Sequence, residues 1–91
     1  MYFQADFDTD FGPIRATWKG GNYIHLYPGD TDQATDVINV WDYENNKPRI
    51  ERNASAMAKE VRTWLYEMER GITINAVRVS EQIDLDDDEQ W

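Results

Sequence analysis

Hydrophobic and polar residues alternate along the first half of the chain with the period of two that is typical of half-buried β-strands. Residues 2–8 show it most clearly, because Phe3, Ala5 and Phe7 fall on one side and Gln4, Asp6 and Asp8 on the other. The same period predicts strands over residues 14–19, 23–27 and 37–43. Glycine, proline, aspartate and asparagine separate these segments, which indicates tight turns and an antiparallel meander.

The spacing changes after residue 53 and predicts one long helix over residues 54–69. Its apolar stripe consists of Met57, Val61, Trp64, Leu65 and Met68. Asn53 or Ser55 can cap its first turn, and Gly71 stands where a left-handed C-terminal residue belongs. Residues 72–79 return to a strand pattern, whose phase slips near Ala76 and indicates a bulge.

The order ββββαβ predicts an α+β fold in a single domain over residues 1–91. We expect an antiparallel sheet of about five strands with the helix packed on one face. The last strand would join an edge, beside either the first strand or the fourth. In the first case the two ends of the chain would share one margin of the domain.

One helix covers one face of such a sheet. The aliphatic residues of the third and fourth strands suit that covered face, which leaves large aromatic side chains on the other: Tyr23, Tyr27, Trp41 and Tyr43, mixed with His25 and Asn39. Four uncovered aromatics would exceed the apolar patch that monomers usually expose. Either the chain itself covers them, with its C-terminal segment or residues 44–52, or a partner or a second copy does.

Charge is distributed unevenly along the chain, whose net charge is −9. Residues 1–10 contain three acids and no base, and the acidic C-terminal segment 81–91 contains six acids and no base. The stretch between them has nine of each and is balanced. This surplus argues against direct nucleic-acid binding, because phosphates require a cationic surface.

Two interpretations of the C-terminal segment are open. It is a solvated tail that aids solubility, or it is anchored to the domain through Ile83, Leu85 and Trp91. In the anchored case its carboxylates would stand at fixed positions and attract a basic partner surface. The candidate residues for this role are Asp84, Asp86, Asp87, Asp88 and Glu89.

Several kinds of chemistry find no support in the sequence. Cysteine is absent, and a single histidine, His25, cannot build a structural zinc site. The acids at Asp6, Asp8 and Asp10 have calcium-loop spacing, but Phe11 stands where that loop needs glycine. We therefore expect no enzyme, no cofactor and no metal. Without an export signal or an apolar membrane span, we expect a cytoplasmic protein.

The segments "VINVWDYENN" and "KEVRTWLYE" resemble small accessory proteins encoded by bacteriophages. The resemblance covers about a third of the chain and carries no site residues with it. It implies a protein of the host cytoplasm that acts on a host or phage macromolecule. Acidic inhibitors of host functions, some of which mimic nucleic acid, are one style among such proteins.

Together these patterns lead to one hypothesis and one alternative. The hypothesis is a non-enzymatic acidic protein that binds, and inhibits or modulates, a partner protein with a basic surface, of which a nucleic-acid-binding protein is one example. The acids of the C-terminal segment would steer this association, and Trp41, Tyr43, Tyr23 and Tyr27 would make the contacts. The alternative is a self-associating assembly protein, a homodimer that uses the aromatic sheet face as its interface.

Overall fold

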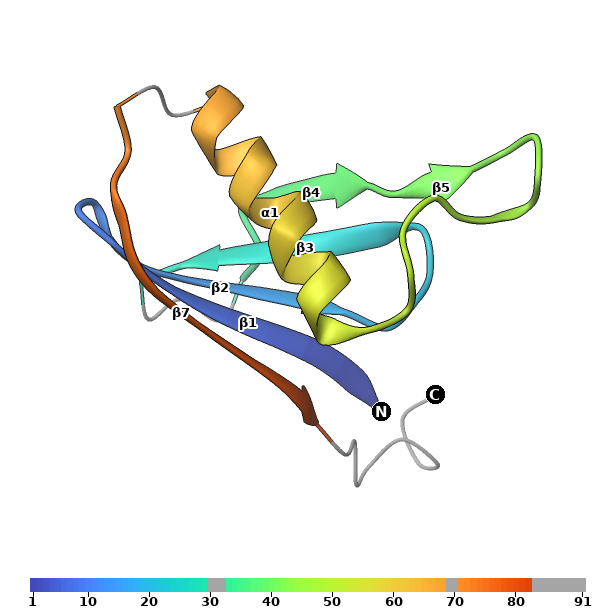
Figure 1. Cartoon of the computed structure of the whole chain (residues 1–91), viewed down its shortest axis with the longest axis horizontal. Helices are drawn as coiled ribbons and strands as arrows, with labels where there is room; N and C mark the ends of the chain where they lie inside the picture. The colour runs from blue at the N-terminus through green and yellow to red at the C-terminus, as the bar shows by residue number, and fades with distance from the viewer. Residues whose placement is uncertain (30–32, 69–70, 83–91) are drawn as a thin grey trace.

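The computed structural model describes residues 1–29, 33–68 and 71–82 and shows the expected α+β fold. A five-stranded antiparallel sheet has the order β4-β3-β2-β1-β7. Its strands are β1 (Tyr2–Thr9), β2 (Gly12–Trp18), β3 (Tyr23–Pro28), β4 (Asp36–Asn39) and β7 (Ile74–Gln82). Figure 1 shows the single helix α1 (Ala54–Met68) lying across one face of this sheet.

The last strand joins the edge beside the first, which is one of the two placements expected. Tyr2 pairs with Gln82, and the register shifts by one residue where Asp8 pairs with Ala76 and Thr9 with Ile74. Asn75 is therefore the extra residue of a bulge, as the phase slip near Ala76 predicted. In Figure 1 the N-terminus lies close to the end of β7.

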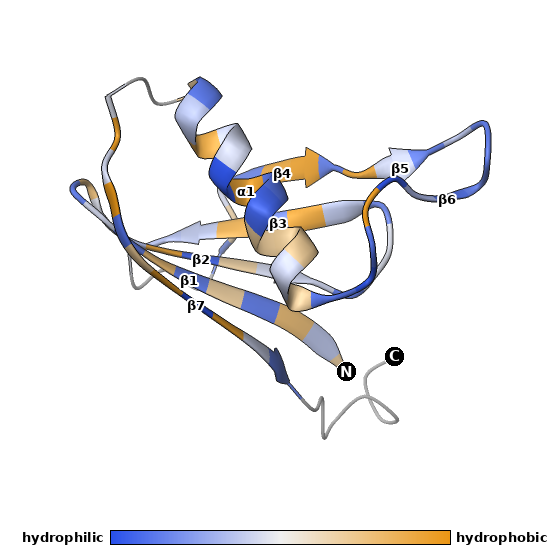
Figure 2. Ribbon diagram, in the orientation of Figure 1, coloured by the Kyte–Doolittle hydropathy of each residue, from blue (hydrophilic) through white to orange (hydrophobic). Residues whose placement is uncertain are grey.

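The core lies between the sheet and α1. Its largest fully buried side chains come from both layers: Phe7, Trp18, Ile24, Val40, Met57, Val61 and Leu65. The alternation along β1 that produces this burial is visible as bands of hydrophilic and hydrophobic colour in Figure 2. The expectation that the aliphatic residues of β3 and β4 face the helix is confirmed, because Ile24, Leu26 and Ile38 are all buried.

Local capping explains where α1 begins. The side-chain oxygen of Asn53 accepts a hydrogen bond from the Ala56 amide at 2.7 Å, so Asn53 rather than Ser55 caps the first turn. Gly71 has a φ of 86°, the left-handed conformation expected after a helix. The described part of the chain has no helix long and apolar enough to cross a bilayer.

The predicted fourth strand is divided in the structure. β4 ends at Asn39, and β5 (Trp41–Asp42) pairs with β6 (Lys47–Pro48) in a separate two-stranded sheet. The Asn39 side chain accepts a hydrogen bond from the Trp41 amide at 2.9 Å, which turns the chain at this point. Figure 1 shows the resulting β5–β6 hairpin projecting away from the main sheet.

Candidate functional site

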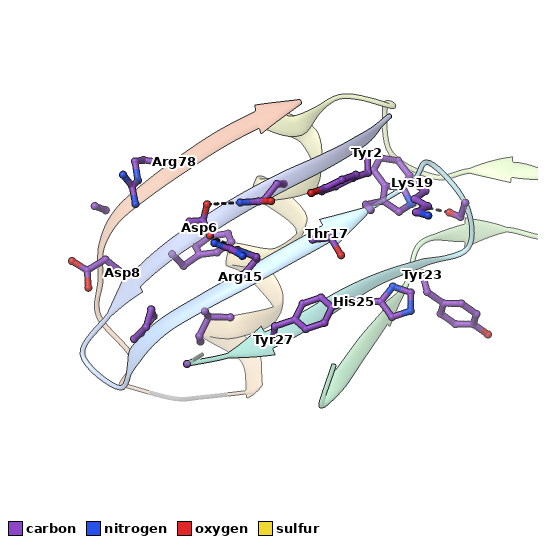
Figure 3. Close-up of a pocket in the computed structure, with 18 of the residues that line it drawn as sticks. Tyr2, Asp6, Asp8, Arg15, Thr17, Lys19, Tyr23, His25, Tyr27 and Arg78 are labelled. Atoms are coloured by element: carbon purple, nitrogen blue, oxygen red, sulfur yellow. Dashed lines mark hydrogen bonds and ion pairs between the residues drawn. The ribbon is translucent and has the colours of Figure 1, made fainter. Parts of the chain in front are cut away.

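The face of the sheet that α1 leaves uncovered is the candidate site, and we call it the open face. Its side chains come from alternate residues of the strands, and a shallow hollow of about 1240 Å³ lies over them. The polar and aromatic residues that line it include Tyr2, Asp6, Asp8, Arg15, Lys19, Tyr23, His25, Tyr27 and Arg78. Figure 3 shows these side chains projecting from β1, β2, β3 and β7.

Charged residues form a row across the open face. The pairing of the strands places Asp6 between Arg15 on β2 and Arg78 on β7. The Arg15 Nε donates to Asp6 Oδ1 at 2.9 Å, and Gln4 Nε2 donates to Asp6 Oδ2 at 2.9 Å. The Asp6 carboxylate therefore neutralises the charge of Arg15 through a direct contact, and Asp6 lies opposite Arg78 on the neighbouring strand.

The same contacts decide the protonation of Asp6. Partial burial acts to raise its pKa, but the hydrogen bonds from Gln4 and Arg15 and the nearby guanidinium charges outweigh that effect. The pKa of Asp6 therefore lies below its ordinary value of 3.8. The hydrogen bond to Asp6 also raises the pKa of Arg15, so both groups are charged at neutral pH.

Aromatic side chains border this row of charges. Tyr23, His25 and Tyr27 follow one another on the same side of β3, and Tyr27 pairs directly with Arg15. Tyr2 lines the hollow from β1. Tyr23 is 44% exposed. The face thus combines flat, amphipathic rings with hydrogen-bonding groups, a composition typical of protein-binding surfaces.

The structure separates the aromatic residues that the sequence grouped together. Tyr23 and Tyr27 line the open face as expected, and Asn39 pairs with Tyr23 at its margin. Trp41 and Tyr43 do not line the hollow, because the chain turns at Asn39 and carries them onto the β5–β6 hairpin. There Tyr43 is 67% exposed, and its hydroxyl accepts a hydrogen bond from Asn39 Nδ2 at 3.1 Å.

The acidic residues also divide into two groups. Asp84, Asp86, Asp87, Asp88 and Glu89 lie outside the described residues, as do Ile83, Leu85 and Trp91. The N-terminal acids are largely engaged within the fold. Besides the contacts of Asp6, the Asp10 carboxylate accepts a hydrogen bond from the Thr73 amide at 3.0 Å. Within the described ranges, histidine and acidic side chains form no cluster of three that could hold a metal ion.

Sequence reasoning did not identify Tyr2, Arg15 and Arg78 as neighbours on the open face. The feature of the sequence that could have revealed the pairing of Asp6 with Arg15 is the turn between the first two strands. Its two connecting residues, Asp10 and Phe11, set the register of these strands. Once Thr9 pairs with Gly12, Asp6 must lie opposite Arg15. The turn was predicted over a broader stretch, which left that register undefined.

Comparison with protein-family models, with curated proteins and with solved structures finds no match to this chain.

Proposed function

We propose that this chain is a non-enzymatic protein that binds a partner protein with a basic surface and inhibits or modulates it. The observation that supports this most strongly is the open face itself. It presents Tyr2, Tyr23 and Tyr27 around a hollow, and no other element of the described ranges covers it. Tyrosine and arginine are the residue types that most often anchor protein interfaces.

The charges of the open face favour a protein over a nucleic acid as the partner. Binding to a phosphate backbone depends on cations that are free to replace counterions. Here Arg15 is held by Asp6 at 2.9 Å, and Asp6 and Asp8 accompany the cations on the same surface. A nearly balanced surface of this kind suits polar contacts to a protein.

The position at which β7 ends favours a basic partner. Gln82, the last residue of β7, pairs with Tyr2, which lines the hollow. The acidic residues between Asp84 and Glu89 begin two positions further along the sequence, so they are tethered to the rim of the open face. Carboxylates tethered there would attract a basic protein toward the tyrosines and accelerate its association.

The surroundings of His25 support a non-enzymatic role. A general base needs a partner that orients it and a nucleophile or substrate proton within reach. The cross-strand neighbours of His25 are Thr17 and Val37, and no carboxylate is directly opposite it. If the resemblance to bacteriophage accessory proteins is extended to this chain, the partner would be a macromolecule of the host cytoplasm.

The test is capture of partners from a bacterial lysate on the immobilised chain, followed by titration of the purified partner at two salt concentrations. Between about 0.1 M and about 1 M salt the Debye length falls from ~10 Å to ~3 Å. We expect affinity to fall steeply over this range. Replacing Asp84, Asp86, Asp87, Asp88 and Glu89 by their amides should abolish most of that salt dependence.

Two tyrosine variants assign the contact surface. Tyr23→Ala should lower the affinity for the partner at least about tenfold if Tyr23 is an anchor of the interface. Tyr66→Ala is the matched control, because Tyr66 is similarly exposed, at 49%, but lies on α1. Equal affinities of the two variants would contradict the assignment to the open face, and affinity that is insensitive to salt would contradict the basic partner.

A further inference from the structure

The two edges of the main sheet are protected to different degrees. Because the strand order is β4-β3-β2-β1-β7, the edges are β4 and β7. An edge strand presents backbone N–H and C=O groups that lack a neighbouring strand, and proteins usually shield them.

The β4 edge is short and partly satisfied. It contains four residues, and the carbonyl of Asn39 accepts a hydrogen bond from the Arg49 guanidinium at 3.1 Å. The Arg49 amide donates to the carbonyl of Val40 at 2.9 Å, so the chain beyond β6 closes this end of the edge. Val37 is the main outward-facing position left on β4.

The β7 edge is nine residues long, and its outward-facing groups follow from the pairing of β1. The backbone amide of Asp10 donates a hydrogen bond to the carbonyl of Thr73 at 3.1 Å, which shows that the backbone groups of Asp10 point toward the strand that contains β7. Backbone direction alternates along a strand, so the even-numbered residues of β1 bond to β7 and the odd-numbered residues bond to β2. The partners of the even-numbered residues, Arg78 and Ser80 among them, therefore point inward.

Val77, Val79 and Glu81 are left with backbone groups that point away from the sheet. Within the described ranges, no backbone hydrogen bond from another element reaches these three residues. Their side chains lie on the helix side of the sheet, where Val79 is opposite Ala5 and is 44% exposed. With respect to the rest of the described chain, the edge therefore offers a regular series of unpaired donors and acceptors, with an exposed valine at its centre.

We propose that a second copy of this chain pairs with this edge, β7 against β7, in an antiparallel arrangement with Val79 on the two-fold axis. In this register the backbone N–H and C=O groups of Val79 bond to those of Val79 in the second copy. The backbone groups of Val77 in each copy bond to those of Glu81 in the other. Every outward-facing group of the three residues is then satisfied by an equivalent group. A register centred on Arg78 would instead place two guanidinium groups directly opposite each other.

Charge and symmetry are compatible with this dimer. Pairing about Val79 places Gln82 of one copy beside Ala76 of the other, so the ends of the two β7 strands, which precede the acidic residues in the sequence, lie about 20 Å apart. That separation exceeds the ~8 Å Debye length at physiological salt. The two-fold axis is perpendicular to the sheet, so both open faces lie on the same side and a partner would meet two of them. The dimer does not depend on the function proposed above.

The experiment is sedimentation velocity on the full chain over a range of concentrations up to about 0.5 mM. We expect the mass to rise to twice that of the chain. Val79→Pro should keep the chain monomeric, because proline removes one outward-facing N–H of β7 and no hydrogen bond to β1. Val37→Pro is the matched control: Val37 is a 49% exposed valine on the other edge, and its variant should still dimerise.

Two further measurements make the result decisive. Val79→Lys places like charges across the axis without a proline and should also give a monomer, and circular dichroism verifies that each variant is folded. In the wild-type chain, amide exchange at Val77, Val79 and Glu81 should slow as concentration rises, whereas exchange at Val37 should not change. A wild-type monomer at the highest concentration, or equal dissociation by Val79→Pro and Val37→Pro, would overturn the proposal. Dissociation by Tyr23→Ala would assign the dimer to the open face instead.

Discussion

The face of the sheet that α1 covers and the face that it leaves open are made from the same strands, residue by residue in alternation. On β3, Ile24 points to the covered face and is fully buried, whereas the adjacent His25 points to the open face and is exposed. Burial of Ile24 removes apolar surface from water, which is the main source of stability in a small domain. We therefore expect the open face to contribute little to stability, and its exposed side chains are available for contacts with other molecules.

The largest difference in stability between the two faces is expected for substitutions of two adjacent residues on β3. Ile24→Ala removes buried methylene groups and leaves a cavity beneath α1, so we expect it to lower the free energy of unfolding by about 2–5 kcal/mol. His25→Ala should change that free energy by less than about 0.5 kcal/mol, as is usual for a surface position. Urea unfolding monitored by tryptophan fluorescence measures both. Similar losses in the two variants would mean that the open face is packed as tightly as the covered one.

A smaller effect on stability is expected where α1 begins. The helix that covers one face of the sheet is stabilised when the backbone amides of its first turn have a hydrogen-bond acceptor. Asn53→Ala removes the acceptor that lies 2.7 Å from the Ala56 amide. We expect a loss of about 1 kcal/mol in the free energy of unfolding. Ser55→Ala is the control, since Ser55 does not cap the helix, and it should be close to neutral when urea unfolding is used to compare the two variants. A larger loss in Ser55→Ala would show that the cap is assigned to the wrong residue.

The smallest effect concerns the row of charges on the open face. The folded pKa of Asp6 is lower than its unfolded value, so the ionised carboxylate stabilises the fold at any pH well above that unfolded value. This contribution is lost as the pH falls through the folded pKa. Since the pair with Arg15 is solvent-accessible, we expect Asp6→Asn to lower stability at neutral pH by only about 0.2–1 kcal/mol.

The dependence on pH distinguishes this contribution from a general effect of the substitution. The difference in melting temperature between the wild-type chain and Asp6→Asn should be present at pH about 7 and should shrink below pH about 4. Asp8→Asn is the control, because Asp8 lies on the same strand and the same face without a bond to arginine. A difference that stays constant down to low pH would contradict an electrostatic origin.

The fold could be predicted from the sequence because its strongest signals are local. The period of two in residues 2–8 and the single apolar stripe of α1 specify the elements, and the helix then covers the aliphatic side of β3 and β4. The positions of Trp41 and Tyr43 could not be predicted in the same way. The side chain of Asn39 bonds to the Trp41 amide and ends β4 within an otherwise continuous strand pattern.

Long-range pairing also limited what could be predicted about the open face. The neighbours of Asp6 are set by the turn after Thr9 and by a strand about seventy residues further along the chain. Periodicity shows which side of a strand a residue occupies, but it does not show which residue of another strand lies opposite. The partner-binding role of the residues from Asp84 to Glu89 stays a prediction, since they lie outside the described residues.

The pairing of β1 with β7 has a consequence for how this protein is synthesised. β1 is translated first, yet one of its two neighbours in the sheet is the last strand of the described chain. Until β7 has left the ribosome, the backbone groups of β1 that bond to it cannot form those hydrogen bonds, so the sheet cannot be completed. Contacts between segments this distant in sequence also slow folding, so the completed sheet should form late in folding.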